Sequence, residues 1–179
     1  MDITLKNKYF GTDGFRGEAN VTLTANHAYD IGRFLGWYYT KQNKRPARIV
    51  IGKDTRRSSY MLEYSIVAGI TASGADAYLL HVTTTPSVAY VVRTENFDCG
   101  IMVSASHNPY QDNGIKFFSP LGTKLPDEME RSIEEVIANG LMDIPNPTGA
   151  NVGRVIPYDE AADKYAHFIQ SKVDGDFNG

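Results

Sequence analysis

Residues 100–118 read GIMVSASHNPYQDNGIKFF, in which two apolar runs enclose a polar loop. The first run, Gly100–Ser104, is short, continuous and apolar, which is typical of a buried strand. The second, Ile115–Phe118, predicts another strand, and the loop before it ends in Asp112-Asn113-Gly114, a strong turn signal. Because only ten residues join the two strands, we expect an antiparallel pair and not a helical crossover.

On either side of this stretch, strand patterns alternate with helical ones. Apolar runs over 47–52 and 75–82 predict two further buried strands. Helical spacing predicts helices over about 24–41, from Ser58 or Ser59 to Ser73, after Pro86, and around Met129–Ile137. This alternation indicates an α/β fold. We expect a three-layer α/β/α sandwich on a mixed, mostly parallel sheet of about four strands.

After residue 140 the pattern changes. Residues 141–153 are rich in proline, asparagine and glycine, have little periodicity and are interpreted as a surface linker. A last helix is predicted at about 159–172, and the turn-rich residues 173–179 are typical of a domain boundary. We therefore expect one domain over 1–140, followed over 141–179 by a linker and a C-terminal helix that lead to a second domain absent from this chain.

Composition excludes several classes of protein. The 179 residues carry a formal net charge of −3, which argues against nucleic acid or a membrane surface as partner. The single cysteine, Cys99, excludes an internal disulfide and suits a reducing compartment. The start of the chain has no apolar signal core, and no run of about 18 apolar residues occurs. We expect a cytoplasmic protein.

The polar loop within 100–118 is the main candidate for chemistry. Ser106 stands beside His107, and Lys116 lies on the returning strand, on the face opposite Ile115 and Phe117. A hydroxyl that accepts and returns a phosphoryl group needs cations, usually a metal, and a group that handles its proton. The alternative is a turn whose hydroxyls and the Asn108 amide cap local backbone groups.

Two further segments point to an anion. Residues 10–17, FGTDGFRG, place glycines including Gly14 around Arg16, which suits a backbone nest with a planar donor fork for phosphate. Residues 52–58, GKDTRRS, lie where a strand ends and a helix begins, the edge at which open α/β sheets bind ligands. Tight turns, helix capping and solvated charge would explain both segments equally well.

Taken together, the segments resemble the N-terminal domain of the α-D-phosphohexomutases, and most closely the phosphoglucosamine mutase branch of that family. The motifs are KYFGTDGFRG over 8–17, SASHNP over 104–109 and DNGIKFFS over 112–119. Phosphomannomutases and phosphoglucomutases usually have threonine at the position of Ser104, and a different opening motif. The resemblance covers nearly the whole chain, to about Ile169.

The resemblance implies that Ser106 is a phosphoserine. It would give its phosphoryl group to glucosamine 6-phosphate, and the 1,6-bisphosphate would reorient and return its other phosphate, releasing glucosamine 1-phosphate. Arg16 and Lys116 match positions beside the transferring group, and His107 is a further catalytic candidate. Phosphate binding falls to Gly14, Arg16, Asn108 and Lys116. A phosphomannomutase or phosphoglucomutase, a non-catalytic phosphosugar-binding module and a phosphoserine-forming hydrolase remain alternatives.

The resemblance also implies Mg²⁺, bound through the phosphate on Ser106 and by three aspartates of a second domain. Asp174-Gly-Asp176 resembles that aspartate loop but lacks its third aspartate and its arginine, so we reject it as the metal site. Catalytic amounts of hexosamine 1,6-bisphosphate are expected as primer. The partners would be a small phosphosugar and the remaining domains of a longer chain, and these 179 residues alone are expected to have no turnover.

Overall fold

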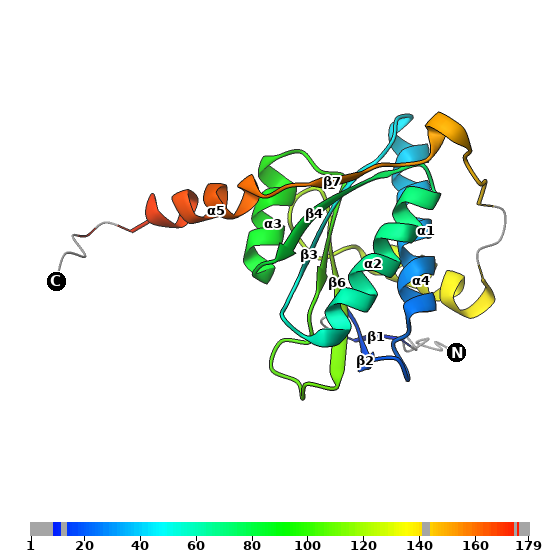
Figure 1. Cartoon of the computed structure of the whole chain (residues 1–179), viewed down its shortest axis with the longest axis horizontal. Coiled ribbons are helices and arrows are strands. Elements are labelled where there is room, and N and C mark those ends of the chain that lie inside the picture. The colour runs from blue at the N-terminus through cyan, green and yellow to red at the C-terminus, as the bar shows by residue number, and fades with distance from the viewer. Residues whose placement is uncertain (1–8, 12–13, 141–143, 174, 176–179) are drawn as a thin grey trace, which may run out of the picture.

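The fold is known from a computed structural model that describes residues 9–11, 14–140, 144–173 and 175. Its described strands form one mixed sheet, in the order β1-β2-β6-β5-β3-β4-β7 (Figure 1). The strand bounds are β1 Phe10–Gly11, β2 Gly14–Glu18, β3 Arg48–Lys53, β4 Asp76–Val82, β5 Cys99–Val103, β6 Asp112–Phe118 and β7 Val155–Pro157.

The predicted α/β fold with a mixed sheet is confirmed, but the expected number of strands was too small. Seven strands pair where about four were expected, because β1, β2 and β7 lie in segments that we interpreted as turns or linker. Strands β5, β3, β4 and β7 are parallel neighbours, whereas β5–β6, β6–β2 and β2–β1 are antiparallel. The antiparallel pair predicted from residues 100–118 is therefore β5–β6.

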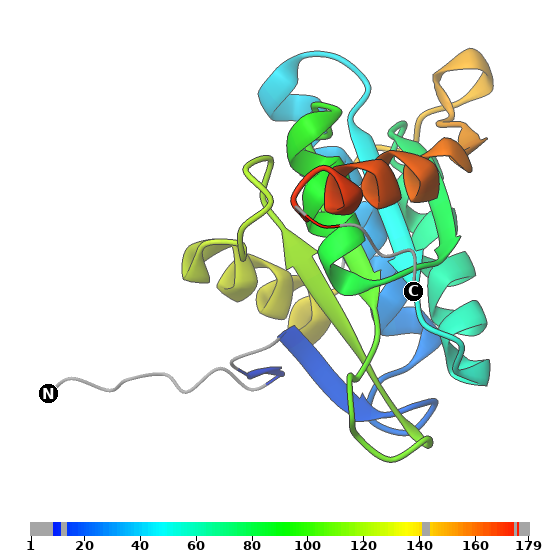
Figure 2. The ribbon, with the colours of Figure 1, turned by 90° about the vertical axis from the view of Figure 1, so that its left-hand side faces the viewer.

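Five α-helices accompany the sheet in the described residues: α1 Ala25–Asn43, α2 Arg57–Ala72, α3 Thr85–Thr94, α4 Asp127–Asn139 and α5 Glu160–Gln170, with a 3₁₀ turn at Gly149–Asn151. One face carries α1, α2 and α4, and the other carries α3 and α5, which gives the three layers seen in Figures 1 and 2. The larger apolar core lies on the first face and includes Ile31, Ile66 and Ile101, each fully buried.

Helices α1 and α2 pack closely because a glycine lies at their contact. A Cβ on Gly32 would come within 2.3 Å of the Ile66 carbonyl oxygen, a backbone atom that has no room to move away. A helix was predicted over about 24–41, and α1 runs through both of its glycines without interruption. The sequence prediction is confirmed here.

The residues after 140 are tied to the domain at several points. Arg33, which is buried in α1, donates hydrogen bonds to the carbonyl oxygens of Ile144 and Pro145. Strand β7 extends the sheet beside β4, and α5 packs on α3, where the rings of Tyr90 and Phe168 stack 4.5 Å apart. The segment interpreted as a linker thus leads into a sheet strand. Among the described residues, no helix is long and apolar enough to cross a membrane.

Candidate active site

The sequence motifs meet at the carboxyl edge of the parallel strands. The 104–111 loop follows β5 and residues 54–56 follow β3, so both leave the sheet at the same end. Figure 2 shows the loop between β5 and β6 at the lower end of the sheet, beside β2. Ligands bind at this edge in open α/β sheets.

Ser106 is presented to solvent in an unusual backbone conformation. Its φ is +57°, a left-handed value that non-glycine residues rarely adopt, and its side chain is exposed. Its N–H donates to the Ser104 hydroxyl at 3.1 Å, and its Oγ lies 3.5 Å from His107 Nδ1. Positive φ at such a residue costs energy and persists only where neighbouring structure holds it.

Arg16 reaches the Ser106 loop from β2. Arg16 lies opposite Gly114 in the β2–β6 register, and the missing side chain at Gly114 leaves room for it: a Cβ there would lie 3.1 Å from Arg16 Cγ. The Arg16 guanidinium donates to Asn108 Oδ1 at 3.2 Å, and the Asn108 amide donates to Asp112 at 3.1 Å. The Arg16 guanidinium is thereby held beside Asn108, which follows Ser106 by two positions in the sequence.

Lys116 and Gly14 lie on the same side of the sheet as Arg16. Alternation along β6 puts Lys116 on the face of Gly114 and away from the buried Ile115, as predicted. Gly14 has φ +92° and lies so close to β6 that a Cβ would meet the Ile115 carbonyl oxygen at 2.3 Å. Gly14 and Lys116 line a cavity of about 240 Å³ together with Thr85, Phe117, Phe118, Lys124 and Glu130.

The predicted site residues therefore form two groups. Arg16, Asn108, Ser106 and His107 are joined through the loop and the Arg16–Asn108 hydrogen bond. In the part of the chain that the structure describes, Lys116 makes no hydrogen bond to this loop, although it shares the sheet face of Arg16.

The contacts of Arg56 were not predicted from the sequence. We expected the following helix to begin at Ser58 or Ser59, but α2 begins at Arg57 and Arg56 is its N-cap residue, without a side-chain cap. The Arg56 guanidinium instead donates hydrogen bonds at 2.6–3.1 Å to four backbone carbonyl oxygens in and next to the 104–111 loop, those of Ser106, Asn108, Pro109 and Asp112. The two serine hydroxyls accept from the Asn113 amide, each at 2.9 Å.

Asp54 fixes Arg56 from the other side. Its carboxylate accepts from Arg56 Nε and from the Arg56 N–H, both at 3.0 Å, and from the Ser59 hydroxyl at 2.5 Å. Burial by itself raises the pKa of Asp54, but hydrogen bonds, led by that from Ser59, outweigh burial, so the net shift is downward. Asp54 therefore stays ionised at neutral pH.

Replacing Asp54 by asparagine is expected to lower the free energy of unfolding at pH 7 by about 1–3 kcal/mol, since its donors lose a charged acceptor. A lowered carboxyl pKa stabilises the fold above the ordinary value of about 4, and this stabilisation is lost as the pH falls through the lowered pKa. The difference from wild type should therefore shrink below about pH 4. Urea unfolding at pH 7 and at acid pH measures it, with the exposed Asp127→Asn as control. A difference that stayed constant with pH would contradict this role.

A second cluster of titratable side chains lies beneath the same edge. Lys53 and Glu63 are almost completely buried, with Nζ and Oε2 3.8 Å apart, and His81 Nδ1 lies 3.8 Å from the other Glu63 oxygen. Lys53 Nζ also lies 3.6 Å from the centre of the Tyr60 ring. Burial raises the pKa of Glu63, and the charges of Lys53 and His81 oppose that rise. The sequence had no signal for this cluster beyond the residue types themselves.

A metal site needs several ligands grouped around one point. Within 9–11, 14–140, 144–173 and 175, no three His, Cys, Asp or Glu side chains are grouped to hold a metal ion. Asp174 and Asp176, which we rejected as ligands, lie outside the described residues. The chain's own described side chains therefore do not form a magnesium site.

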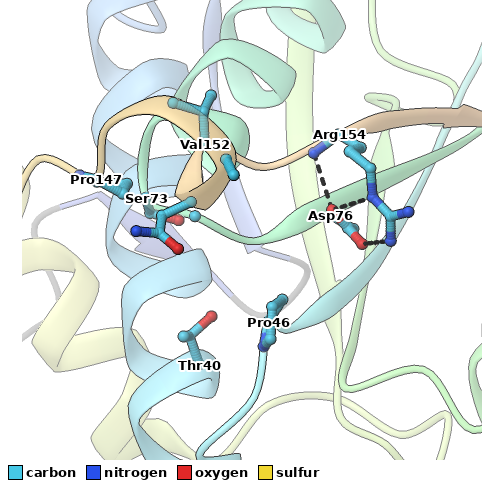
Figure 3. A pocket seen from close by; sticks show the side chains of 10 residues that line it. Thr40, Pro46, Ser73, Asp76, Pro147, Val152 and Arg154 are labelled. Carbon is cyan, nitrogen blue, oxygen red and sulfur yellow. Dashed lines mark hydrogen bonds and ion pairs between the residues drawn. The ribbon is translucent and has the colours of Figure 1, made fainter.

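A larger cavity, of about 520 Å³, lies at the other end of the sheet. It is lined by the ends of α1 and α2, by the start of β4 and by residues 147–154. Figure 3 shows Thr40, Ser73 and the Asp76–Arg154 ion pair on its walls. Among the described residues that line the larger cavity, the charged side chains are those of Asp76 and Arg154, and these two are paired with each other. The candidate site is therefore the carboxyl edge of the parallel strands, where Ser106 lies.

Comparison with known proteins identifies the family to which the chain is similar. The family model described as phosphoglucomutase/phosphomannomutase, alpha/beta/alpha domain I, matches residues 7–142. Phosphoglucosamine mutase of Lachnoclostridium phytofermentans is 60% identical over 172 residues, which are 96% of this chain and 38% of that protein. The same enzyme of Bacillus cereus is 49% identical with the same coverage. The chain thus spans about two fifths of the length of these curated relatives.

Solved structures show the same fold. The crystal structure of a phosphoglucomutase/phosphomannomutase family protein from Burkholderia thailandensis superposes with a TM-score of 0.76 at 25% sequence identity. The match covers 94% of this chain and 36% of that one. The chain therefore belongs to the phosphoglucomutase/phosphomannomutase family, to whose alpha/beta/alpha domain I its residues 7–142 correspond.

Proposed function

We propose that this chain is the nucleophile domain of a phosphohexomutase that interconverts glucosamine 6-phosphate and glucosamine 1-phosphate. The observation that carries the proposal is Ser106, an exposed hydroxyl held at the carboxyl edge of the sheet, with Arg16 fixed to its loop through Asn108. The names of relatives at 49–60% identity support the glucosamine substrate.

In the proposed reaction, the Ser106 Oγ–phosphorus bond breaks as a bond forms from phosphorus to the anomeric hydroxyl oxygen of glucosamine 6-phosphate. The proton of the sugar hydroxyl leaves, and Ser106 Oγ takes up a proton. The 1,6-bisphosphate then turns around, and the bond between its O6 and phosphorus breaks as a bond forms from that phosphorus to Ser106 Oγ. Ser106 Oγ gives up its proton, and O6 of the sugar takes one up. Glucosamine 1-phosphate is released, and Ser106 is phosphorylated again.

The neighbouring side chains suit the charges that develop in this transfer. The phosphoryl oxygens carry negative charge, which the cations of Arg16 and Lys116 would stabilise. His107, whose Nδ1 is 3.5 Å from Ser106 Oγ, is placed to handle the hydroxyl proton. The Asn108 amide and the backbone at Gly14 would orient the phosphate. The hydrogen bond from Arg16 to Asn108 would hold the guanidinium beside the loop that carries the phosphate.

Magnesium belongs to the proposal only as an ion supplied with ligands from outside this chain. The described residues offer it one ligand, an oxygen of the phosphate on Ser106, and that does not make a site. When bound, the ion would neutralise phosphoryl charge. A hexosamine 1,6-bisphosphate would prime the unphosphorylated enzyme by phosphorylating Ser106.

We further propose that turnover needs other domains. The curated relatives are more than twice the length of the matched region, so sugar recognition and the metal ligands would come from their remaining parts. We expect the 179-residue chain alone to show no mutase activity. The expected location is cytoplasmic, with no nucleic acid or membrane as partner, in keeping with the net charge of −3.

Substrate competition tests the proposed function. The full-length enzyme that carries this domain would be given Mg²⁺, a trace of bisphosphate primer, and glucosamine 6-phosphate, glucose 6-phosphate and mannose 6-phosphate together. Phosphorus NMR should show glucosamine 1-phosphate appearing first. Faster conversion of the glucose or mannose phosphate would assign the chain to the phosphoglucomutase or phosphomannomutase branch, and conversion of none would favour a binding module.

A further inference from the structure

We propose that Arg56 is a positioning residue that holds the 104–111 loop in the one conformation from which Ser106 reacts. The proposal rests on the proposed function, because it assigns Arg56 a part in phosphoryl transfer at Ser106. Arg56 lies fifty residues before Ser106, at the start of α2. It belongs to the 52–58 segment expected at the ligand-binding edge, but it was not among the individual residues expected to bind phosphate.

Arg56 donates hydrogen bonds to four backbone carbonyl oxygens along the loop. Its Nη2 donates to the carbonyl oxygens of Ser106 and Asn108 at 3.0 and 2.9 Å. Its Nη1 donates to the carbonyl oxygens of Pro109 and Asp112 at 2.6 and 3.1 Å. Both ends of the loop and its tip are thus bound to one planar fork. Only arginine presents several donors in a fixed plane, so lysine cannot reproduce this arrangement.

The fork itself has little freedom. Asp54 accepts from its Nε at 3.0 Å, and the same carboxylate is held by the Arg56 N–H and by the Ser59 hydroxyl. Asp54 in turn donates its own N–H to the Val103 carbonyl oxygen at 3.0 Å, at the end of the strand that leads to Ser106. Hydrogen bonds through Asp54 and Arg56 therefore connect the loop to the sheet.

The conformation that Arg56 holds is one that the loop would not keep by itself. Ser106 has φ +57°, and such values persist where surrounding contacts enforce them. The Ser106 carbonyl oxygen is one of the four acceptors, so Arg56 fixes the peptide group that follows the strained residue. All four acceptors are backbone atoms, which remain the same whether Oγ carries a proton or a phosphoryl group. The contacts of Arg56 can therefore persist through both states of the proposed cycle.

The chain supplies a matched control. Arg57 is the next residue, is also arginine and is exposed, so the two positions differ in their contacts and not in charge. We compare Arg56→Ala, Arg56→Lys and Arg57→Ala in the full-length enzyme. If Arg56→Ala does not fold, Arg56→Lys keeps the charge and the aliphatic part of the side chain while losing the planar fork, and carries the test.

Two measurements separate a positioning role from a general loss of stability. For the Arg56 variants, kcat should fall about 100-fold with KM changed by less than about threefold, since a misplaced reacting group loses rate more than affinity. Added guanidinium chloride, below denaturing concentration, should restore part of the kcat of Arg56→Ala. Arg57→Ala should behave like wild type and show no response to guanidinium.

Amide hydrogen exchange followed by mass spectrometry gives a readout that does not depend on activity. Peptides covering 104–113 should exchange faster in the Arg56 variants, whereas peptides of α1 and α4 should not change. Unchanged exchange in 104–113, or faster exchange with wild-type kcat, would overturn the proposal. A wild-type enzyme without mutase activity would instead refute the proposed function, and the exchange result would still decide whether Arg56 holds the loop.

Discussion

Replacing Ser106 by alanine is expected to lower mutase turnover by about 10⁴-fold or more, since the phosphoryl group then has no acceptor on the enzyme. The loop should keep its shape. Arg56 holds it through backbone carbonyl oxygens, and Ser106 contributes its own N–H and carbonyl to the loop's hydrogen bonds. Affinity for the sugar phosphate should therefore change little, and calorimetric titration with glucosamine 6-phosphate measures it beside the NMR assay.

Ser132→Ala on α4 is the control for this replacement, because it removes a serine hydroxyl far from the loop. It should retain wild-type turnover. Persistent activity in Ser106→Ala would show that another residue carries the phosphoryl group. Loss of both turnover and affinity would favour the alternative in which the loop only binds phosphosugar.

Replacing Lys53 by methionine is expected to destabilise the fold by about 3–5 kcal/mol at neutral pH, because it leaves the Glu63 carboxylate buried without its main counter-charge. Glu63 already has a raised pKa from burial, and loss of Lys53 raises it further. A carboxyl with a raised pKa favours the folded state at low pH, and that stabilisation is lost as the pH rises through the raised value. The destabilisation should therefore be greater at pH 8 than at pH 5.

A second replacement tests whether the missing charge is the cause. The double variant Lys53→Met with Glu63→Gln removes both charges and should recover much of the lost stability. Lys41→Met on the exposed side of α1 serves as control and should stay within about 0.5 kcal/mol of wild type. Urea unfolding of all three at both pH values gives the result. A double variant as unstable as Lys53→Met would contradict the account of the pair.

The parts of the fold that the sequence predicted are those with a strong period or a continuous apolar run. The predicted bounds of the core strands β3 to β6 and of the helices agree with the observed bounds to within a few residues. Strands β1 and β2 were missed because their glycines, Gly11 and Gly14, are typical of turns, and the pairing of β2 depends on its register with β6. Strand β7 has three residues, one of them proline, and its position is fixed by Arg154 bonding to the distant Asp76.

The candidate site divides in the same way. The loop around Ser106 could be proposed from the motif, as could Arg16 and Lys116, since each stands in a local pattern of residue types. Arg56 could not, because its role depends on loop carbonyl oxygens that only the folded loop brings together. The Lys53–Glu63 pair was invisible for the same reason: two charged residues ten positions apart read as surface charge, and only the structure shows both to be buried.

The central claim is that Ser106 carries a phosphoryl group and passes it to a sugar phosphate. Phosphopeptide mapping of the full-length enzyme tests it most directly, after incubation with glucosamine 1,6-bisphosphate and Mg²⁺ and removal of excess ligand. When the bisphosphate carries a radioactive phosphorus label, the account predicts one labelled phosphoryl group on Ser106, distinguished from Ser104 by fragmentation. After unlabelled glucosamine 6-phosphate is added, the label should pass to the sugar while Ser106 is phosphorylated again by the unlabelled 6-phosphate. A labelled phosphoryl group on any other residue, or a label that stays on Ser106 after the addition, would contradict it.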